Sequence, residues 1–175
     1  FCVLEQPKLI TNTVRYIVLK DSNITWQFLA WINSGLVNRR VSLFAYTNHI
    51  KPYEIRSIPL PESLLEDDEL AELARQMVEL RKAEYAERKG LFMDLADVKN
   101  IDVVDLILTP SKRDYARGFW DFETYDFAAF KRRFKAPSRF KQRFEEAKRK
   151  VIEIKARLSD LDSRLEGRIA HHYKL

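Results

Sequence analysis

The stretch Lys51-Pro52-Tyr53-Glu54-Ile55-Arg56-Ser57-Ile58-Pro59-Leu60-Pro61 divides the chain into two parts of different character. Ile55, Ile58 and Leu60 are apolar, whereas Pro59 and Pro61 prevent a helix from running through them. The two prolines also exclude a central strand, because each removes a donor from the ladder of hydrogen bonds. We therefore predict a short strand that ends at a sheet edge, followed by a stiff, extended exit into a helix.

Before this stretch, the sequence predicts a mixture of short strands and one helix. Residues 8–11 and 14–19 are rich in β-branched and aromatic residues and predict two strands, and residues 41–46 predict another. Between them, apolar residues recur at helical spacing over residues 25–38, which predicts an amphipathic helix. Asn33-Ser34-Gly35 has low helix propensity, so this helix is expected to end or bend there.

After this stretch, two apolar stripes predict two long helices. The first helix is expected over residues 62–90, with Gly90 as its C-terminal stop, and its stripe is Leu70, Leu73, Met77, Leu80 and Glu84. The second stripe closes the chain and consists of Val151, Ile154, Leu158, Leu161, Leu165 and Ile169. Complementary stripes that lie far apart in the sequence predict an antiparallel helical pair, similar to a coiled coil.

The predicted fold class is therefore α+β: a small mixed α/β recognition unit followed by a long antiparallel helical pair with an inserted subdomain. Residues 1–61 would form the α/β part and residues 62–90 the first long helix. Residues 91–130 are crowded with aromatics and would form the inserted accessory subdomain. Residues 131–175 would form a basic segment and the closing helix.

Composition limits where the protein acts. A single cysteine, Cys2, excludes an internal disulfide and fits a reducing compartment such as the cytoplasm. No apolar run approaches the ~20 residues of a membrane span, and no signal peptide is recognisable. Because the sequence begins at Phe1, we expect a fragment of a longer protein.

The positive charge is concentrated in one segment. Residues 131–150 contain ten lysines and arginines against Glu145 and Glu146, whereas the chain as a whole carries a net charge of +5. Such a patch is what polyanion binding requires. Phenylalanines recur four residues apart within it, which fits either base stacking or an apolar helix face. The candidate phosphate-binding residues are Lys131, Arg132, Arg133, Lys135, Arg139, Lys141 and Arg143.

Catalytic chemistry has little support in the sequence. There is no glycine-rich phosphate loop, Ser-His-Asp set or cysteine cluster, and only four glycines. The adjacent His171 and His172 would point about 100° apart on a helix, so a metal site is not expected. Glu153-Ile154-Lys155 resembles half of a nuclease metal site, but it lies in a predicted long helix. We expect no catalytic residue, metal or cofactor in this chain.

Four segments, in this order, resemble a known family. They are Pro7-Lys8-Leu9-Ile10, Phe28-Leu-Ala-Trp-Ile-Asn-Ser-Gly-Leu36, Ile55-Arg-Ser-Ile-Pro-Leu-Pro61 and Leu165-Glu-Gly-Arg-Ile-Ala-His-His-Tyr-Lys-Leu175. The order is similar to that of the target-recognition (specificity) domain of adenine-specific restriction-modification enzymes. The nearest forms are TaqI-like C-terminal specificity domains and type I specificity subunits. The sequence departs from the family pattern at Glu166, His172 and Lys174, and residues 91–149 have no counterpart in it.

The resemblance implies a prokaryotic protein that binds double-stranded DNA and holds it for an adenine-N6 methyltransferase core. That core would bind S-adenosylmethionine and would lie elsewhere in the same protein or in a partner subunit, with or without a nuclease. Base edges would be contacted from the polar loop before Ile55 and the residues near it. The candidates there are Arg39, Arg40, Asn48, His49 and Lys51.

Two other functions fit the same residues. The chain could be a helical protein-interaction or assembly module whose basic segment binds an acidic partner. RNA binding is a third possibility, which competition between duplex DNA and RNA would separate.

Overall fold

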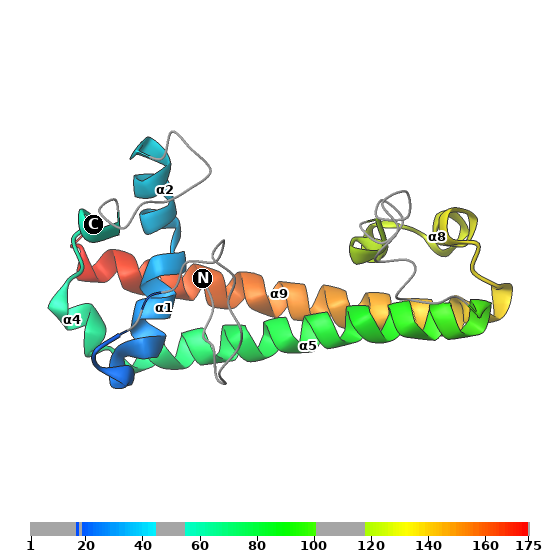
Figure 1. Cartoon of the computed structure of the whole chain (residues 1–175), viewed down its shortest axis with the longest axis horizontal. Coiled ribbons are helices and arrows are strands. Elements are labelled where there is room, and N and C mark those ends of the chain that lie inside the picture. The colour runs from blue at the N-terminus through cyan, green and yellow to red at the C-terminus, as the bar shows by residue number, and fades with distance from the viewer. Residues whose placement is uncertain (1–16, 18, 45–54, 101–117, 175) are drawn as a thin grey trace. The chain divides into compact units, whose positions relative to one another are not determined.

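The computed structural model describes residues 17, 19–44, 55–100 and 118–174, and all regular secondary structure in these residues is helical (Figure 1). The chain divides into two compact units. Unit 1 comprises residues 1–78 and 160–175, and unit 2 comprises residues 79–159. The long helices α5 (Asp68–Lys99) and α9 (Lys141–His172) each contribute residues to both units. None of the described helices is long and apolar enough to cross a membrane.

The prediction of an α+β fold is wrong, because the described residues contain helices where strands were expected. Residues 41–44 belong to α2 (Gly35–Phe44). In the organising stretch, the Ile58 N–H donates to the Ile55 carbonyl over 3.1 Å and forms a turn rather than a strand. Short apolar runs do not distinguish a strand from a buried helix, which explains the error. The strand predicted at residues 8–11 and most of that at 14–19 lie outside the described residues.

Unit 1 is built on a broken pair of short helices. After η1 (Ser22–Ile24), α1 (Thr25–Asn33) ends at Ser34, whose ψ of 153° is extended, and α2 follows. This confirms the predicted break at Asn33-Ser34-Gly35. The Ser34 hydroxyl accepts from the Val37 N–H over 3.3 Å, so it caps α2. Trp31 and Ile32 on α1 are both buried, as is Leu64 on the short helix α4 (Glu62–Leu65).

The helix α5 is longer than the sequence predicted. A carboxylate oxygen of Asp67 accepts from the Leu70 N–H over 3.0 Å and caps its start. The helix then continues through Gly90 and ends at Lys99, and the next residue, Asn100, has a φ of 51°. The prediction that Gly90 ends the helix is wrong, because an interior glycine lowers helix propensity without breaking the hydrogen-bond pattern.

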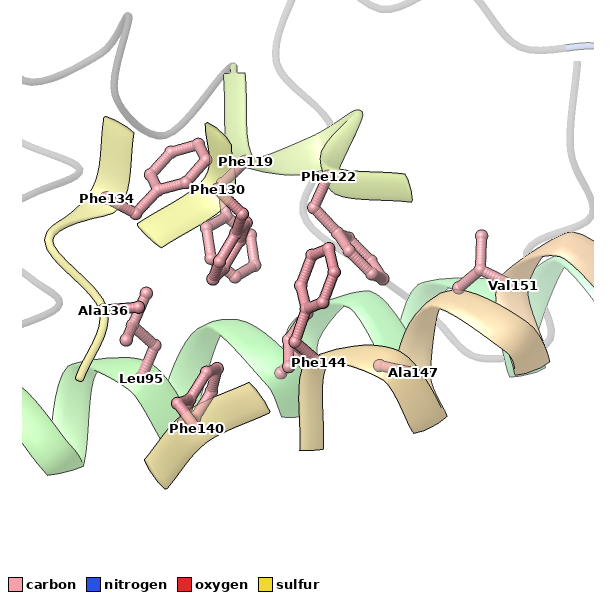
Figure 2. Close-up of a cluster of buried hydrophobic side chains, with 11 residues drawn as sticks. Leu95, Phe119, Phe122, Phe130, Phe134, Ala136, Phe140, Phe144, Ala147 and Val151 are labelled. Carbon is pink, nitrogen blue, oxygen red and sulfur yellow. The ribbon is translucent and has the colours of Figure 1, made fainter. Parts of the chain in front are cut away.

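An aromatic cluster forms the core of unit 2 (Figure 2). Between α5 and α9 the chain forms η3 (Phe122–Thr124), α8 (Phe127–Phe134) and η4 (Ser138–Phe140). These segments place phenylalanine rings on Leu91 and Leu95 of α5 and on Ala147 and Val151 of α9. Rings pack at centroid distances such as 4.5 Å for Phe130 and Phe144. The buried rings of the cluster are Phe119, Phe122, Phe130, Phe134, Phe140 and Phe144.

Within each unit, α5 and α9 pack together and run antiparallel, which confirms the predicted helical pair. In unit 2, Arg143 near the start of α9 pairs with Asp94 near the end of α5, with Nε and Oδ2 2.6 Å apart. In unit 1, Arg168 near the end of α9 pairs with Glu69 at the start of α5, also at 2.6 Å. The two apolar stripes supply the buried face, and Leu70, Leu80, Leu158 and Leu165 are all buried.

Candidate nucleic-acid interface

Six cations of unit 2 form an exposed surface, which we call the basic surface. The sequence alternates cations with phenylalanines over residues 130–144, and the phenylalanines occupy the buried face of α8, η4 and the first turn of α9. The cations between them are therefore turned outward. The basic surface consists of Lys131, Arg132, Arg133, Lys135, Arg139 and Lys141, all exposed.

Two members of the basic surface also contribute to local structure. Lys131 Nζ donates to the Ser138 hydroxyl over 2.7 Å and so connects α8 to η4. The guanidinium carbon of Arg133 lies 5.7 Å from the ring centroids of both Tyr125 and Phe134. The other four side chains form no hydrogen bond or ion pair with the residues that the structure describes.

The turn after α8 brings positive charges close together. Lys135 is left-handed, with φ 50° and ψ 40°, and its N–H donates to the Lys131 carbonyl. Lys99 lies nearby on α5 and donates to the Phe134 carbonyl over 2.8 Å. Burial, together with the positive charge of Lys135, lowers the pKa of Lys99. Burial is the larger cause of this shift, and the nearby charge of Lys135 adds to it.

Arg143, which the sequence grouped with the phosphate-binding candidates, pairs with carboxylates within unit 2. Its guanidinium donates to Glu87 and, over 2.6 Å, to Asp94. Burial alone would lower the pKa of Arg143, but these two carboxylates raise it. Its charge is therefore compensated inside the protein, in contrast to the charges of the basic surface.

The remaining candidates belong to unit 1. Arg39 and Arg40 are exposed on α2, and the Arg39 guanidinium lies beside Gly35. Asn48, His49 and Lys51 lie outside the described residues. The structure thus describes the arginines of α2 and the basic surface on two different units.

Unit 1 contains a hydrogen-bonded junction that the sequence did not reveal. The Tyr173 hydroxyl accepts from Trp31 Nε1 over 2.8 Å and donates to the Pro59 carbonyl. Beside it, Glu166 accepts from the Gly35 N–H over 2.5 Å. Three of the four segments that carry the family resemblance therefore meet at this junction, and Glu166 is one of the residues that depart from the family pattern.

An ionic cluster lies next to the junction. Arg168 Nε donates to both carboxylate oxygens of Asp67, at 2.6 and 2.8 Å, and His172 Nε2 lies 2.7 Å from Oδ2. Burial alone would raise the pKa of Asp67, but the hydrogen bonds from Arg168, His172 and the Leu70 N–H lower it to about 2. The other ring nitrogen of His172 is 3.0 Å from the Ser63 hydroxyl. This explains the histidine at position 172 as a structural partner.

Unit 2 holds a buried ion network of its own. Arg88 on α5 pairs with Glu84 on the same helix at 2.8 Å and with Glu123 of η3 at 2.7 Å. Lys155 of α9 also pairs with Glu123. Burial alone would raise the pKa of Glu123, but hydrogen bonds from Arg88 and Lys155 lower it to about 2. The signal in the sequence was Glu84, a carboxylate in an otherwise apolar stripe, which requires a buried cation.

Comparisons with protein-family models, with curated proteins and with solved structures found no match.

The exposed charges of the described residues suit the basic surface to binding. Over residues 17, 19–44, 55–100 and 118–174, no group of three or more histidine, cysteine or acidic side chains could hold a metal ion. The cations of the basic surface are exposed and fall within the eleven residues 131–141, and four of them lack a partner among the described residues. A cluster of uncompensated cations is suited to a polyanionic ligand.

Proposed function

We propose that this chain is the DNA-binding, target-recognition part of an adenine-specific restriction-modification methyltransferase. It would position duplex DNA for a catalytic domain outside these 175 residues. The observation that carries the proposal is the basic surface, in which six exposed cations lie over a buried aromatic core. Cations that neutralise DNA phosphates release condensed counterions, which supplies binding free energy.

The junction of unit 1 supports the family assignment independently of charge. Its hydrogen bonds join Trp31, Pro59 and Tyr173, which come from three separate segments of the family resemblance. Residues that recur together in a family are expected to contact one another when they stabilise a common module. One of these segments, residues 55–61, was expected as a strand and forms a turn instead, and its Pro59 carbonyl accepts the hydrogen bond from Tyr173.

Under this proposal the two units contribute differently. The exposed arginines of α2, Arg39 and Arg40, lie on the unit that carries the family segments and would contact the DNA near the target. The basic surface of unit 2 would bind phosphates. The catalytic domain would hold S-adenosylmethionine and methylate an adenine turned out of the duplex.

The test is the effect of removing charge from the basic surface. The triple variant Arg132→Ala/Arg133→Ala/Lys135→Ala should bind two duplexes of unrelated sequence more weakly than the unmodified chain, by the same factor for both. Fluorescence anisotropy with labelled duplexes measures this, and circular dichroism checks the helix content. Unchanged affinity of the folded variant would refute a role for these residues in DNA binding.

A protein-interaction role is the second candidate, and one observation favours it. Tyr85 and Trp120 in unit 2 stack with ring centroids 5.5 Å apart, yet they remain 58% and 39% exposed. Exposed tyrosine and tryptophan are enriched in the energetic centres of protein interfaces. The double variant Tyr85→Ala/Trp120→Ala should retain full duplex affinity if DNA is the ligand of the basic surface.

A further inference from the structure

The rings that alternate with the cations cannot reach a ligand. Phe130, Phe134 and Phe144 are 0% exposed and Phe140 is 4% exposed. Figure 2 shows these side chains directed into the cluster between α8, α5 and α9. Binding of single-stranded nucleic acid typically depends on exposed rings on which bases stack. The basic surface offers charge without such rings.

The cations of α8 contribute to the stability of the fold. Lys131, Arg132 and Arg133 occupy the last turn of α8, where the helix dipole favours positive charge. Lys131 also bonds to Ser138, and Arg133 packs over two aromatic rings. Part of the basicity of this segment is thus explained by the stability of the fold.

Arg139 and Lys141 make no comparable contribution to the stability of the fold. They lie at the beginning of the helical run that η4 and α9 form, and no acidic residue occupies the first turn of α9. The dipole disfavours cations at this end of a helix. Both side chains are exposed and form no hydrogen bond or ion pair with the described residues. Their charges therefore slightly oppose the helix dipole and remain available to a ligand.

We propose that Arg139 and Lys141, together with Arg132 and Lys135, bind the phosphates of a DNA duplex, and that the basic surface makes no contact with bases. The inference rests on the proposed DNA-binding function. It assigns to this surface the part of the DNA affinity that does not depend on base sequence. Base recognition takes place elsewhere. Single-stranded DNA gains nothing from stacking here, so it binds more weakly than the duplex, whose charge density is higher.

The experiment compares two charge-removing double variants of the full chain. Arg139→Gln/Lys141→Gln removes the proposed phosphate ligands. Lys89→Gln/Arg157→Gln removes the same charge from exposed positions of unit 2 on α5 and α9. Arg157 is sixteen residues from Lys141 on α9, roughly 24 Å along a helix. Affinities for two unrelated duplexes and for one single strand are measured by anisotropy over a range of salt concentrations, and melting temperatures are recorded.

The expected result has three parts. The Arg139→Gln/Lys141→Gln variant binds both duplexes more weakly by an equal factor, and its slope of log affinity against log salt is smaller by about 2. Its melting temperature is equal to or higher than that of the unmodified chain, because the removed charges opposed the helix dipole. The control variant keeps the slope of the unmodified chain.

Several outcomes would overturn the inference. It fails if the unmodified chain binds duplex DNA but the Arg139→Gln/Lys141→Gln variant keeps both affinity and slope. It also fails if that variant loses affinity for only one of the two duplexes, or if the unmodified chain prefers the single strand. If the unmodified, folded chain binds no duplex even at low salt, the proposed DNA-binding function itself fails.

Discussion

The guanidinium of Arg143 lies against Gly90: a Cβ atom at position 90 would be 3.3 Å from Arg143 Nη2. Glu87 and Asp94 hold the guanidinium from either side of that glycine along α5. The absence of a side chain at Gly90 therefore leaves room for Arg143 of α9 to pack against α5 within unit 2. Its φ is not positive, so the glycine is required by space and not by backbone conformation.

Two glycine-to-alanine substitutions should have different effects. A Cβ atom at Gly167 on α9 would meet no atom within 4 Å, so Gly167→Ala should stabilise the protein by up to ~1 kcal/mol through helix propensity. At Gly90, crowding of the anchored Arg143 should cancel that gain, so Gly90→Ala should stabilise less or destabilise. Chemical denaturation of both variants measures the difference. Equal stabilisation by the two substitutions would show that the Arg143 side chain can move aside without loss of stability.

Loss of the Tyr173 hydroxyl should destabilise unit 1. The Trp31 indole N–H, on a side chain that is 2% exposed, would lose its acceptor. An unsatisfied buried donor costs about 1–3 kcal/mol, so Tyr173→Phe should lower the free energy of unfolding by that amount. The control is Tyr85→Phe, because Tyr85 is 58% exposed and should tolerate the change. Equal unfolding free energies for the two variants would contradict the proposed importance of the junction.

The contribution of Asp67 to stability should depend on pH. Its pKa falls from an ordinary 3.8 to about 2 in the folded protein. A lowered folded pKa contributes stability above pH ~4, which is lost as the pH falls towards 2. At ~1.4 kcal/mol for each pKa unit the contribution is about 2 kcal/mol. Unfolding of the unmodified chain and of Asp67→Asn should therefore converge as the pH is lowered from about 5 to about 2. A difference that stays constant over this range would rule out the ionic role of Asp67.

Removing one partner from the buried network of unit 2 should be costly. Glu123→Ala would leave Arg88, whose side chain is 9% exposed, without one of its two carboxylates. Breaking a buried ion pair in this way typically costs about 3–5 kcal/mol. The matched control is Glu79→Ala, which removes the exposed partner of Lys82 and should cost under ~1 kcal/mol. Comparable unfolding free energies for the two variants would argue against the network.

The helical half of the fold could be predicted because its pattern is long and repetitive. The stripes through Leu70 and Leu158 recur over many turns, and such repeats identify both the helices and the faces they bury. The break at Ser34 was also predictable, from low propensity over three residues. The continuation of α5 past Gly90 was not predictable. The sequence does not show that Gly90 leaves space for the Arg143 side chain rather than ending the helix.

The prediction of strands was wrong because short apolar segments do not distinguish the period of a strand from that of a helix. Residues 41–44 are compatible with both periods, and the helix that begins at Gly35 continues through them without a breaker. The alternation of cations and phenylalanines was informative about position, since the cations are exposed and the phenylalanines buried. It could not indicate that Arg143 would be paired, because its partners Glu87 and Asp94 lie about fifty residues away in the sequence.

The most direct test of the account is the salt dependence of duplex binding by the unmodified chain. Four uncompensated cations that contact phosphates predict a slope of log affinity against log salt of roughly −3 to −4, equal for duplexes of unrelated sequence. Anisotropy titrations at several salt concentrations give this slope directly. A folded chain that binds no duplex at low salt, or whose binding does not change with salt, would contradict the claim that the basic surface binds DNA.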